Sequence, residues 1–250
     1  GASVNITADM VAPLVRQHAP LCMRHLHETL TTTHHLRHYG RLQYNLFLKE
    51  LGLPVEAALL FWRRMFSTMT DDKFNKEHRY NIRHGYGLEG RRLNYPAKSC
   101  ARIITQDPPG PQDTHGCPFR HFSPQNLSTA LSTYYHVAPD EQAEILQAAK
   151  AGHYHVACTR LFEITHAKQG VARGDGLGQG ESVAHPNRYM EASWRLAQQQ
   201  PAEHGDHPAE HTGRPDLMPG VPVPGHRGGH QQGDQERCGG AQHSGQIQAG

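Results

Sequence analysis

Apolar residues recur at helical spacing along most of the first 200 residues of the chain. The clearest run follows Pro54, where apolar positions recur in steps of three, one, three, three and one, and Glu56, Arg63 and Arg64 fall on the opposite face. This is the pattern of one side of an α-helix, so it predicts an amphipathic helix that begins at Pro54. The apolar positions are Val55, Ala58, Leu59, Trp62, Met65 and Phe66.

The same periodicity, read with capping residues, predicts a mainly helical protein. No alternating apolar run is long enough to favour a sheet, so we expect the all-α class with few or no short strands. The other predicted helices run from Thr7 to about Gln17, from Pro20 onward, over residues 40–51, briefly before Gly85, from Ser123 to about Tyr134, over Pro139–Ala151, over His153–Lys168 and from Pro186 to about Gln199.

Composition divides the chain into four parts. We expect a helical domain over residues 1–168, a Gly-rich loop over 169–184 and a final helix of the same domain over 185–199. Residues 200–250 are rich in Gly, Pro, His and Gln and have few large apolar side chains, so this tail is predicted to be disordered. The chain does not begin with Met, and we expect it to be a fragment of a longer protein.

The sequence shows neither a membrane span nor a secretory signal. No apolar run approaches the length of a transmembrane helix, and the first residues lack a signal-peptide pattern. Five cysteines, an odd number, without a secretory signal argue against a disulfide framework and favour a reducing compartment.

Positive charge is concentrated in one stretch. Residues 37–102 contain 13 Lys or Arg and 6 Asp or Glu, a net charge of 13 − 6 = +7, whereas the whole chain carries +2. A basic stretch of this kind is typical of a surface that binds phosphate, although a solvated basic face gives the same composition.

Four cysteines are widely separated in the sequence. Cys22, Cys100, Cys117 and Cys158 include no C-x-x-C pair, and helical periodicity places Cys22 and Cys158 on core-facing sides. Three interpretations remain open: buried free thiols, a zinc site, which normally presents its ligands in close pairs, and an iron–sulfur cluster assembled by the fold. Cys238 lies in the Gly/His/Gln-rich tail and has no comparable setting.

Arginine, amide and aromatic side chains alternate within the basic stretch. Arg37 and Arg41 are four residues apart, which places both guanidinium groups on one side of a helix, and Lys49 follows two turns later. The blocks that contain Tyr44 and Tyr80–Arg83 add aromatic rings that can stack on bases. A tyrosine-rich edge of the core with charged rims would show the same residues.

Other chemistries find little support in the sequence. No H-E-x-x-H motif accompanies the 21 histidines, and no G-x-x-x-x-G-K-[ST] loop is present. A histidine-dependent metallohydrolase and an independent ATPase are therefore not expected.

Six ordered blocks of sequence resemble the C-terminal domain of the large subunit of eukaryotic DNA primase. The resemblance extends from about Pro20 to Phe162 and resumes at His185–Tyr189. The blocks are Pro-Leu-Cys22-Met-Arg-x-Leu-His, His34-His35-Leu-Arg-His, Gly40-Arg-x-Gln-Tyr-x-Leu-Phe-Leu-Lys49, Tyr80-Asn-Ile-Arg-His84, His115-Gly-Cys-Pro-Phe-Arg-His121 and His153-Tyr-x-Val-Ala-Cys158.

The resemblance implies a helical domain gathered around one 4Fe–4S cluster held by Cys22, Cys100, Cys117 and Cys158. It implies a non-catalytic, nuclear domain that binds the 5′-triphosphate end of the RNA primer and the template DNA, while the small primase subunit forms the phosphodiester bonds. Partners would be that subunit and DNA polymerase alpha, which receives the primer. Together with the basic and aromatic blocks, it assigns nucleic-acid and triphosphate binding to Arg37, His38, Arg41, Tyr44, Lys49, Tyr80, Asn81 and Arg83.

The chain departs from the family pattern at His78, where relatives carry Tyr. Two alternatives to the regulatory function are a DNA-binding redox module that uses the cluster and a zinc-bearing nucleic-acid module. The ratio of iron to zinc distinguishes the second alternative, and electrochemistry on DNA-bound protein distinguishes the first.

Overall fold

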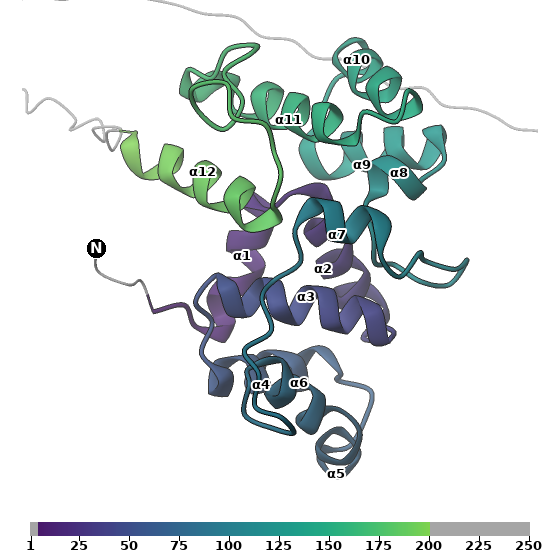
Figure 1. Ribbon diagram of the computed structural model, residues 1–250, viewed down its shortest axis with the longest axis vertical. Coiled ribbons are helices and arrows are strands. Elements are labelled where there is room, and N and C mark those ends of the chain that lie inside the picture. Colours follow the sequence, from purple (N-terminus) through teal and green to yellow (C-terminus); the bar gives the residue numbers. More distant parts are fainter. Residues whose placement is uncertain (1–4, 201–250) are drawn as a thin grey trace, which may run out of the picture. The chain divides into compact units, whose positions relative to one another are not determined.

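The computed structural model describes residues 5–200, which fold as helices joined by loops (Figure 1). Within this range no strand forms, and one isolated bridge joins Gly176 to Glu181. The predicted all-α class is confirmed. The predicted tail at 200–250, including Cys238, lies outside the described residues apart from residue 200. None of the described helices is long and apolar enough to span a membrane.

Helices account for most of the described residues. In chain order they are α1 (Ala8–His18), α2 (Leu21–Thr33), α3 (His38–Glu50), α4 (Val55–Met65), α5 (Asp71–Phe74), the π-helix η1 (Asn75–Arg79), α6 (Tyr80–Gly85), α7 (Cys100–Thr105), α8 (Pro118–His121), α9 (Pro124–Tyr135), α10 (Pro139–Lys150), α11 (Tyr154–Thr165), the 3₁₀ turn η2 (Ala167–Gln169) and α12 (Pro186–Gln199).

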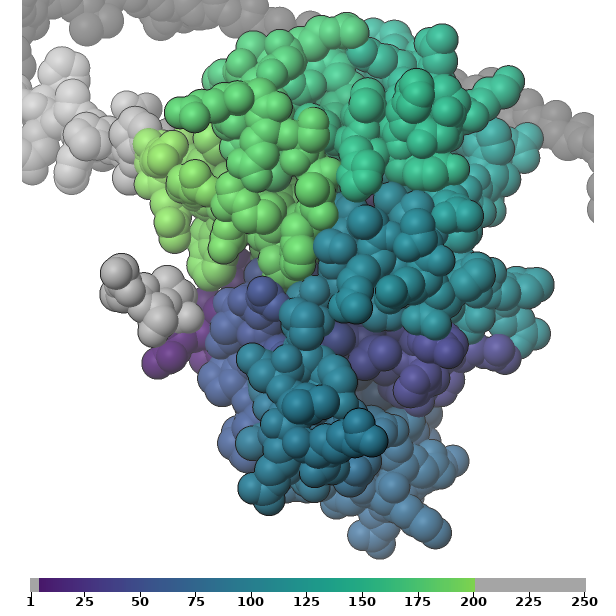
Figure 2. All heavy atoms as spheres, in the orientation of Figure 1, coloured from purple at the N-terminus to yellow at the C-terminus, as the bar shows by residue number. Residues whose placement is uncertain are grey.

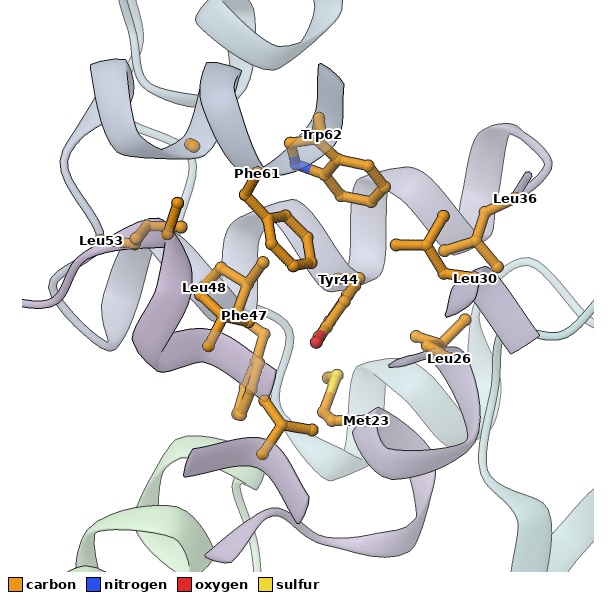
Figure 3. Close-up of a cluster of buried hydrophobic side chains, with 14 of the residues drawn as sticks. Met23, Leu26, Leu30, Leu36, Tyr44, Phe47, Leu48, Leu53, Phe61 and Trp62 are labelled. Atoms are coloured by element: carbon orange, nitrogen blue, oxygen red, sulfur yellow. The ribbon is translucent and has the colours of Figure 1, made fainter. Parts of the chain in front are cut away.

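A first hydrophobic cluster joins α1, α2, α3 and α4. Its centre is aromatic, with Tyr44 and Phe47 of α3 packed against Phe61 and Trp62 of α4 (Figure 3). The periodic positions after Pro54 therefore face the core as predicted, and Pro54 itself is the N-cap of α4. Burying large aromatic side chains contributes most to a core of this size.

The segment from Asp71 to Gly85 is helical throughout, which extends well beyond the predicted short helix before Gly85. The side chains of Phe74, His78 and Ile82 are buried, at a spacing of four residues. An α-helix has 3.6 residues per turn, so a π segment, with its wider turn, keeps such a spacing on one face. Because His78 is polar, the sequence pattern did not indicate an apolar face here.

Two further clusters occupy the second half of the chain. The second cluster packs α8, α9, α10 and α11 together and includes Leu21 from α2. The third joins Phe162 of α11 to Val183 and to Tyr189 of α12. The predicted helices at 124–135 and 186–199 are confirmed, and Ser123 caps the first of them by accepting a hydrogen bond from the Asn126 N–H.

The Gly-rich segment after η2 is a loop, as predicted, and a buried carboxylate organises it. Glu163 of α11 accepts hydrogen bonds from the N–H groups of Gly174 and Gly176, and Arg160 lies 3.6 Å from its other oxygen. The loop ends at Val183, which leads into α12. In the space-filling view α12, in light green, lies against the purple and blue of the first helices, and it contacts α1 and α3 (Figure 2). The loop thus allows α12, the last described helix, to pack against α1 and α3.

Candidate metal centre and nucleic-acid interface

The four candidate cysteines line one cavity, although up to 77 residues separate neighbouring members in the sequence. Cys22 lies in the first turn of α2, Cys100 opens α7, Cys117 is the N-cap of α8 and Cys158 lies in α11. Apolar and aromatic side chains complete the wall of the cavity. These wall residues are Pro20, Ile103, Ile104, Pro118, Phe119, Tyr154, His155, Val183 and Pro186.

The cavity lies where the three hydrophobic clusters meet. Cys22 packs against the first cluster, Cys117 against the first and second, Cys158 against the second and third, and Cys100 against the third. A group bound by all four sulfurs would therefore connect every part of the core. The backbone N–H of Cys100 donates to the carbonyl of Ala184, which fixes the mouth of the cavity beside α12.

Burial determines the protonation of these thiols. Burial, together with the neighbouring Cys117 thiol, raises the pKa of Cys100 to about 12. Burial, followed by the charges of the other cysteines, raises the pKa of Cys22 and of Cys158 well above its ordinary value. Without a cation the four sulfurs remain neutral thiols, and none forms a disulfide. Metal ions bind thiolates, so the set can ionise together only around positive charge.

Backbone N–H groups partly offset this cost at Cys117. Burial raises the pKa of the Cys117 thiol, and hydrogen bonds from the N–H groups of Arg120 and Phe119 lower it. Cys117 precedes Pro118, so α8 begins at the cysteine and directs its first N–H groups toward the sulfur. Hydrogen bonds to the sulfurs are among the features that set the reduction potential of an iron–sulfur cluster.

A second site is formed at the start of α3. Arg37 is the N-cap, and no side chain among residues 5–200 caps the first N–H groups of the helix. His38 and Arg41, which share one side of α3, line a pocket with Asn81 of α6. Uncapped N–H groups and the helix dipole both favour a negatively charged ligand. The structure brings these three predicted residues together although 40 positions separate Arg41 from Asn81.

Aromatic and imidazole side chains also line this pocket, together with Leu42, Asn45 and Ile82. Trp62 and Phe66 contribute from α4, and His84 from α6. His78 of the π-helix stacks on Phe66 with ring centroids 4.6 Å apart, and its buried Nδ1 has no hydrogen-bond partner among the described residues. The prediction missed His78 and His84 as pocket residues, because their placement depends on the π segment.

Tyr44 is a correction to the predicted interface. Its side chain is 0% exposed, and its hydroxyl lies 2.7 Å from His27 Nδ1 in the first cluster. The sequence predicts that Tyr44 stacks on bases, but the structure buries its ring in the first cluster. Tyr44 therefore cannot contact nucleic acid.

The other residues predicted for the nucleic-acid interface differ in whether their side chains are free to bind a ligand. Lys49 donates to the carbonyl oxygens of Gly85 and Tyr95 and to Asn94 Oδ1, which uses all three of its N–H donors. It connects α3 to the segment after α6 and is not free to bind phosphate. Arg83 pairs with Glu89, with Nε 2.6 Å from the carboxylate oxygen. Tyr80 is 51% exposed, and Arg37 is exposed with its Nη2 bonded to Gln112.

Helix α3 also supports the metal centre. The amide side chain of Gln43 accepts a hydrogen bond from the Gly116 N–H at 3.0 Å and donates to its carbonyl oxygen at 3.5 Å. Gly116 immediately precedes Cys117 and has a positive φ of 91°. One helix therefore positions both the candidate anion site and a candidate metal ligand.

The sequence of the chain matches a known protein family over most of its length. The C-terminal domain of the eukaryotic and archaeal DNA primase large subunit matches residues 12–190. The chain belongs to this family. The matched range contains all four cysteines and both segments of the candidate nucleic-acid site, so the resemblance of the sequence blocks to the primase family is confirmed.

Named members of the primase family are similar to the chain over the same range. Identity is 52% over 190 residues with the DNA primase large subunit of Schizosaccharomyces pombe, covering 75% of this chain and 39% of the relative. It is 43% over 193 residues with that of Homo sapiens, covering 76% and 36%, and 43% over 184 residues with that of Saccharomyces cerevisiae, covering 72% and 34%. The chain thus spans well under half the length of the curated relatives it matches.

Proposed function

We propose that this chain is the iron–sulfur regulatory domain of a DNA primase large subunit, which binds the 5′-triphosphate end of an RNA primer paired to template DNA. In this proposal the domain is non-catalytic, acts in the nucleus and supports primer initiation, elongation and transfer to DNA polymerase alpha. The small primase subunit, its partner through the rest of the large subunit, carries out the polymerisation.

The observation that carries the proposal is the pocket at the uncapped start of α3. His38, Arg41 and Asn81 converge there, and the first backbone N–H groups of α3, which no side chain of residues 5–200 caps, can donate to phosphate oxygens. Four of the exposed basic residues that form no ion pair among residues 5–200 lie on η1 and on the loop after α6. They are Lys76, Arg79, Arg91 and Arg92. These can contact a nucleic-acid backbone without sequence preference.

The four cysteines fit a 4Fe–4S cluster. When bound, such a cluster supplies positively charged iron that keeps four thiolates ionised and cross-links the segments that carry them. Within residues 5–200 no three His, Cys, Asp or Glu side chains converge closely enough for one metal ion. A four-iron cluster binds each thiolate through a different iron, and the four cysteines around one cavity offer four such ligands.

The experiment compares two RNA primers annealed to the same DNA template, one with a 5′-triphosphate and one with a 5′-hydroxyl. Binding is measured by fluorescence anisotropy at several salt concentrations. We expect the triphosphate-ended duplex to bind more tightly, with the difference shrinking as salt rises, because each phosphate contact releases counterions. Arg41→Glu should reduce the triphosphate preference by about 10-fold or more, because it places a negative charge in the pocket.

The matched control is Arg173→Glu, which makes the same charge change on the Gly-rich loop, where Arg173 pairs with Glu144. It should leave the triphosphate preference unchanged. Equal binding of both primers by the unmodified protein would refute the proposed function. Equal loss for both primers in Arg41→Glu would reduce Arg41 to a general backbone contact.

A further inference from the structure

An aromatic side chain at the start of α3 is left without a role by the phosphate pocket. Tyr39 follows His38, and its side chain is 40% exposed although it is large and partly apolar. The His38 and Tyr39 rings are 5.0 Å apart and meet edge to face. Since His38 lines the pocket, Tyr39 lies at its border, on the neighbouring side of α3.

Two side chains, Lys98 and His115, lie against the exposed Tyr39 ring. The Lys98 ammonium lies 5.9 Å from the centre of the Tyr39 ring, and the His115 ring lies 5.3 Å away at an angle of 43°. A cation over an aromatic face is attracted by the ring quadrupole. Both supports come from segments far from α3 in the sequence, so the fold holds the ring in place.

Asp107 positions both supports. Its carboxylate is 3.2 Å from Lys98 Nζ, and its backbone carbonyl accepts a hydrogen bond from His115 Nε2. Asp107 has a φ of 47°, in the left-handed region that non-glycine residues seldom adopt. Asp107 is held in this conformation and bonded through two groups. It therefore gives the Tyr39 ring a rigid support, unlike that of a loosely packed surface tyrosine.

We infer that Tyr39 is a stacking platform for the base of the primer's 5′-terminal nucleotide, whose triphosphate occupies the neighbouring pocket. The inference rests on the proposed function, because the phosphates bring the base to the ring. A base has a flat π-face and stacks on an exposed tyrosine with little regard to its identity. The platform adds affinity for the nucleotide itself beyond its charge, and it is not expected to select among bases.

The platform and the metal centre share a segment of chain. His115 is two residues from Cys117, and Gln43 of α3 holds Gly116 between them. Tyr39 and Gln43 are four residues apart on α3, so the same side of the helix contacts the ring's support and the cysteine segment. The base platform is therefore built on the segment that leads into the candidate metal ligand.

The test uses an RNA–DNA duplex with a 5′-triphosphate and the fluorescent base 2-aminopurine in the 5′-terminal nucleotide. We expect binding to quench this fluorescence, because a stacked base loses emission. Tyr39→Phe should retain the quenching and the affinity. Tyr39→Leu should abolish the quenching and weaken binding about 5- to 150-fold, the range that corresponds to loss of one base–aromatic stack.

A second duplex separates the base from the phosphates. Its 5′-terminal nucleotide carries the triphosphate but has no base, and we expect the unmodified protein to bind it as weakly as Tyr39→Leu binds the complete duplex. Tyr39→Leu should lose nothing more on this duplex, since the partner of the ring is already absent. The matched control, Tyr134→Leu on α9, should behave as the unmodified protein does.

Two outcomes have different meanings. If the triphosphate preference persists but neither base removal nor Tyr39→Leu changes affinity and quenching, the platform is refuted while the proposed function stands. If the unmodified protein shows no triphosphate preference, the proposed function itself fails. Thermal melting of Tyr39→Leu close to that of the unmodified protein excludes misfolding as the cause of a loss.

Discussion

At the scale of single residues, burial separates side chains that composition treats alike. Tyr39, Tyr44 and Tyr80 all lie in the basic stretch, yet Tyr39 and Tyr80 are exposed and Tyr44 is in the centre of the first cluster. Arg41 and Lys49 are both basic residues of α3, but Lys49 has no free N–H left for a ligand. Residue type therefore indicates the chemistry of the surface only at positions where the side chain is exposed and not already bonded within the protein.

Tyr44→Phe tests the corrected role of Tyr44. The substitution removes the hydroxyl that lies 2.7 Å from His27 Nδ1 and leaves a buried imidazole without a partner on either nitrogen. We expect it to lower the free energy of unfolding by about 1–3 kcal/mol. Binding to the triphosphate-ended duplex should not change. Chemical denaturation and anisotropy measure the two effects, and Tyr80→Phe, at an exposed position, is the matched control. Weakened binding without loss of stability would restore Tyr44 to the interface.

At the scale of helices, α12 shows how a correctly predicted element acquires a function from its neighbours. Ser193 lies 2.8 Å from His18 Nδ1 of α1 and 2.7 Å from His166 Nε2 next to α11. His166 Nδ1 donates to the Phe162 carbonyl, so His166 Nε2 accepts a hydrogen bond from the Ser193 hydroxyl. The Ser193 oxygen in turn accepts a hydrogen bond from His18 Nδ1. This network of neutral groups joins α12 to the two helices that flank it.

Acid should weaken this attachment. Burial, with the charge of His166 as a smaller cause, lowers the pKa of His18, and burial lowers the pKa of His166. The unfolded chain therefore takes up protons at a higher pH than the folded one, so stability present above about pH 6.5 is lost as pH falls through the lowered values. The protection factors of the α12 amides against hydrogen exchange, which correct for the intrinsic effect of pH, should fall at about pH 5.5 relative to about pH 7.5, more than those of α10.

Ser193→Ala is the companion change. It should accelerate α12 exchange at neutral pH as well, by leaving both imidazoles without their shared partner. Protection factors of α12 that are independent of pH and of Ser193 would show that apolar packing alone holds the helix.

The boundaries of the long helices followed from the sequence, and those of the short ones did not. α4, α9, α10 and α12 have apolar periodicity and clear caps, and they begin and end within a residue or two of the prediction. α7 and α8 are six and four residues long, too short to show periodicity. They form because their neighbours cover them, which local propensity does not record.

At the scale of the whole molecule, the four cysteines lie where three hydrophobic clusters meet. An iron–sulfur cluster bound to them would act as a cross-link between segments distant in the sequence. The stability of the domain should therefore depend on the metal, since formation of the site and folding are coupled.

Cys100→Ser tests this dependence. We expect loss of iron and of the visible absorbance of the cluster, together with a lower melting temperature, because one thiolate ligand is removed at the junction of α7 and α12. Iron and sulfide analysis of anaerobically purified protein, with melting curves, measures these effects. Cys238→Ser is the matched control and should keep its iron. A Cys100→Ser protein that is iron-free, melts normally and binds the duplex would show that the cluster is dispensable for the fold.

By itself, the sequence determined the helical class, the limits of the long helices and the residue types available for metal and phosphate, because periodicity, capping and side-chain chemistry are local. Only the tertiary structure decided which of these metal- and phosphate-binding residue types lie together in one site. It gathered the cysteines at the junction of three clusters, buried Tyr44, engaged Lys49 internally and joined Asn81 to Arg41 through a π-helix. Long-range packing makes these choices, since each depends on where a helix lies rather than on whether it forms.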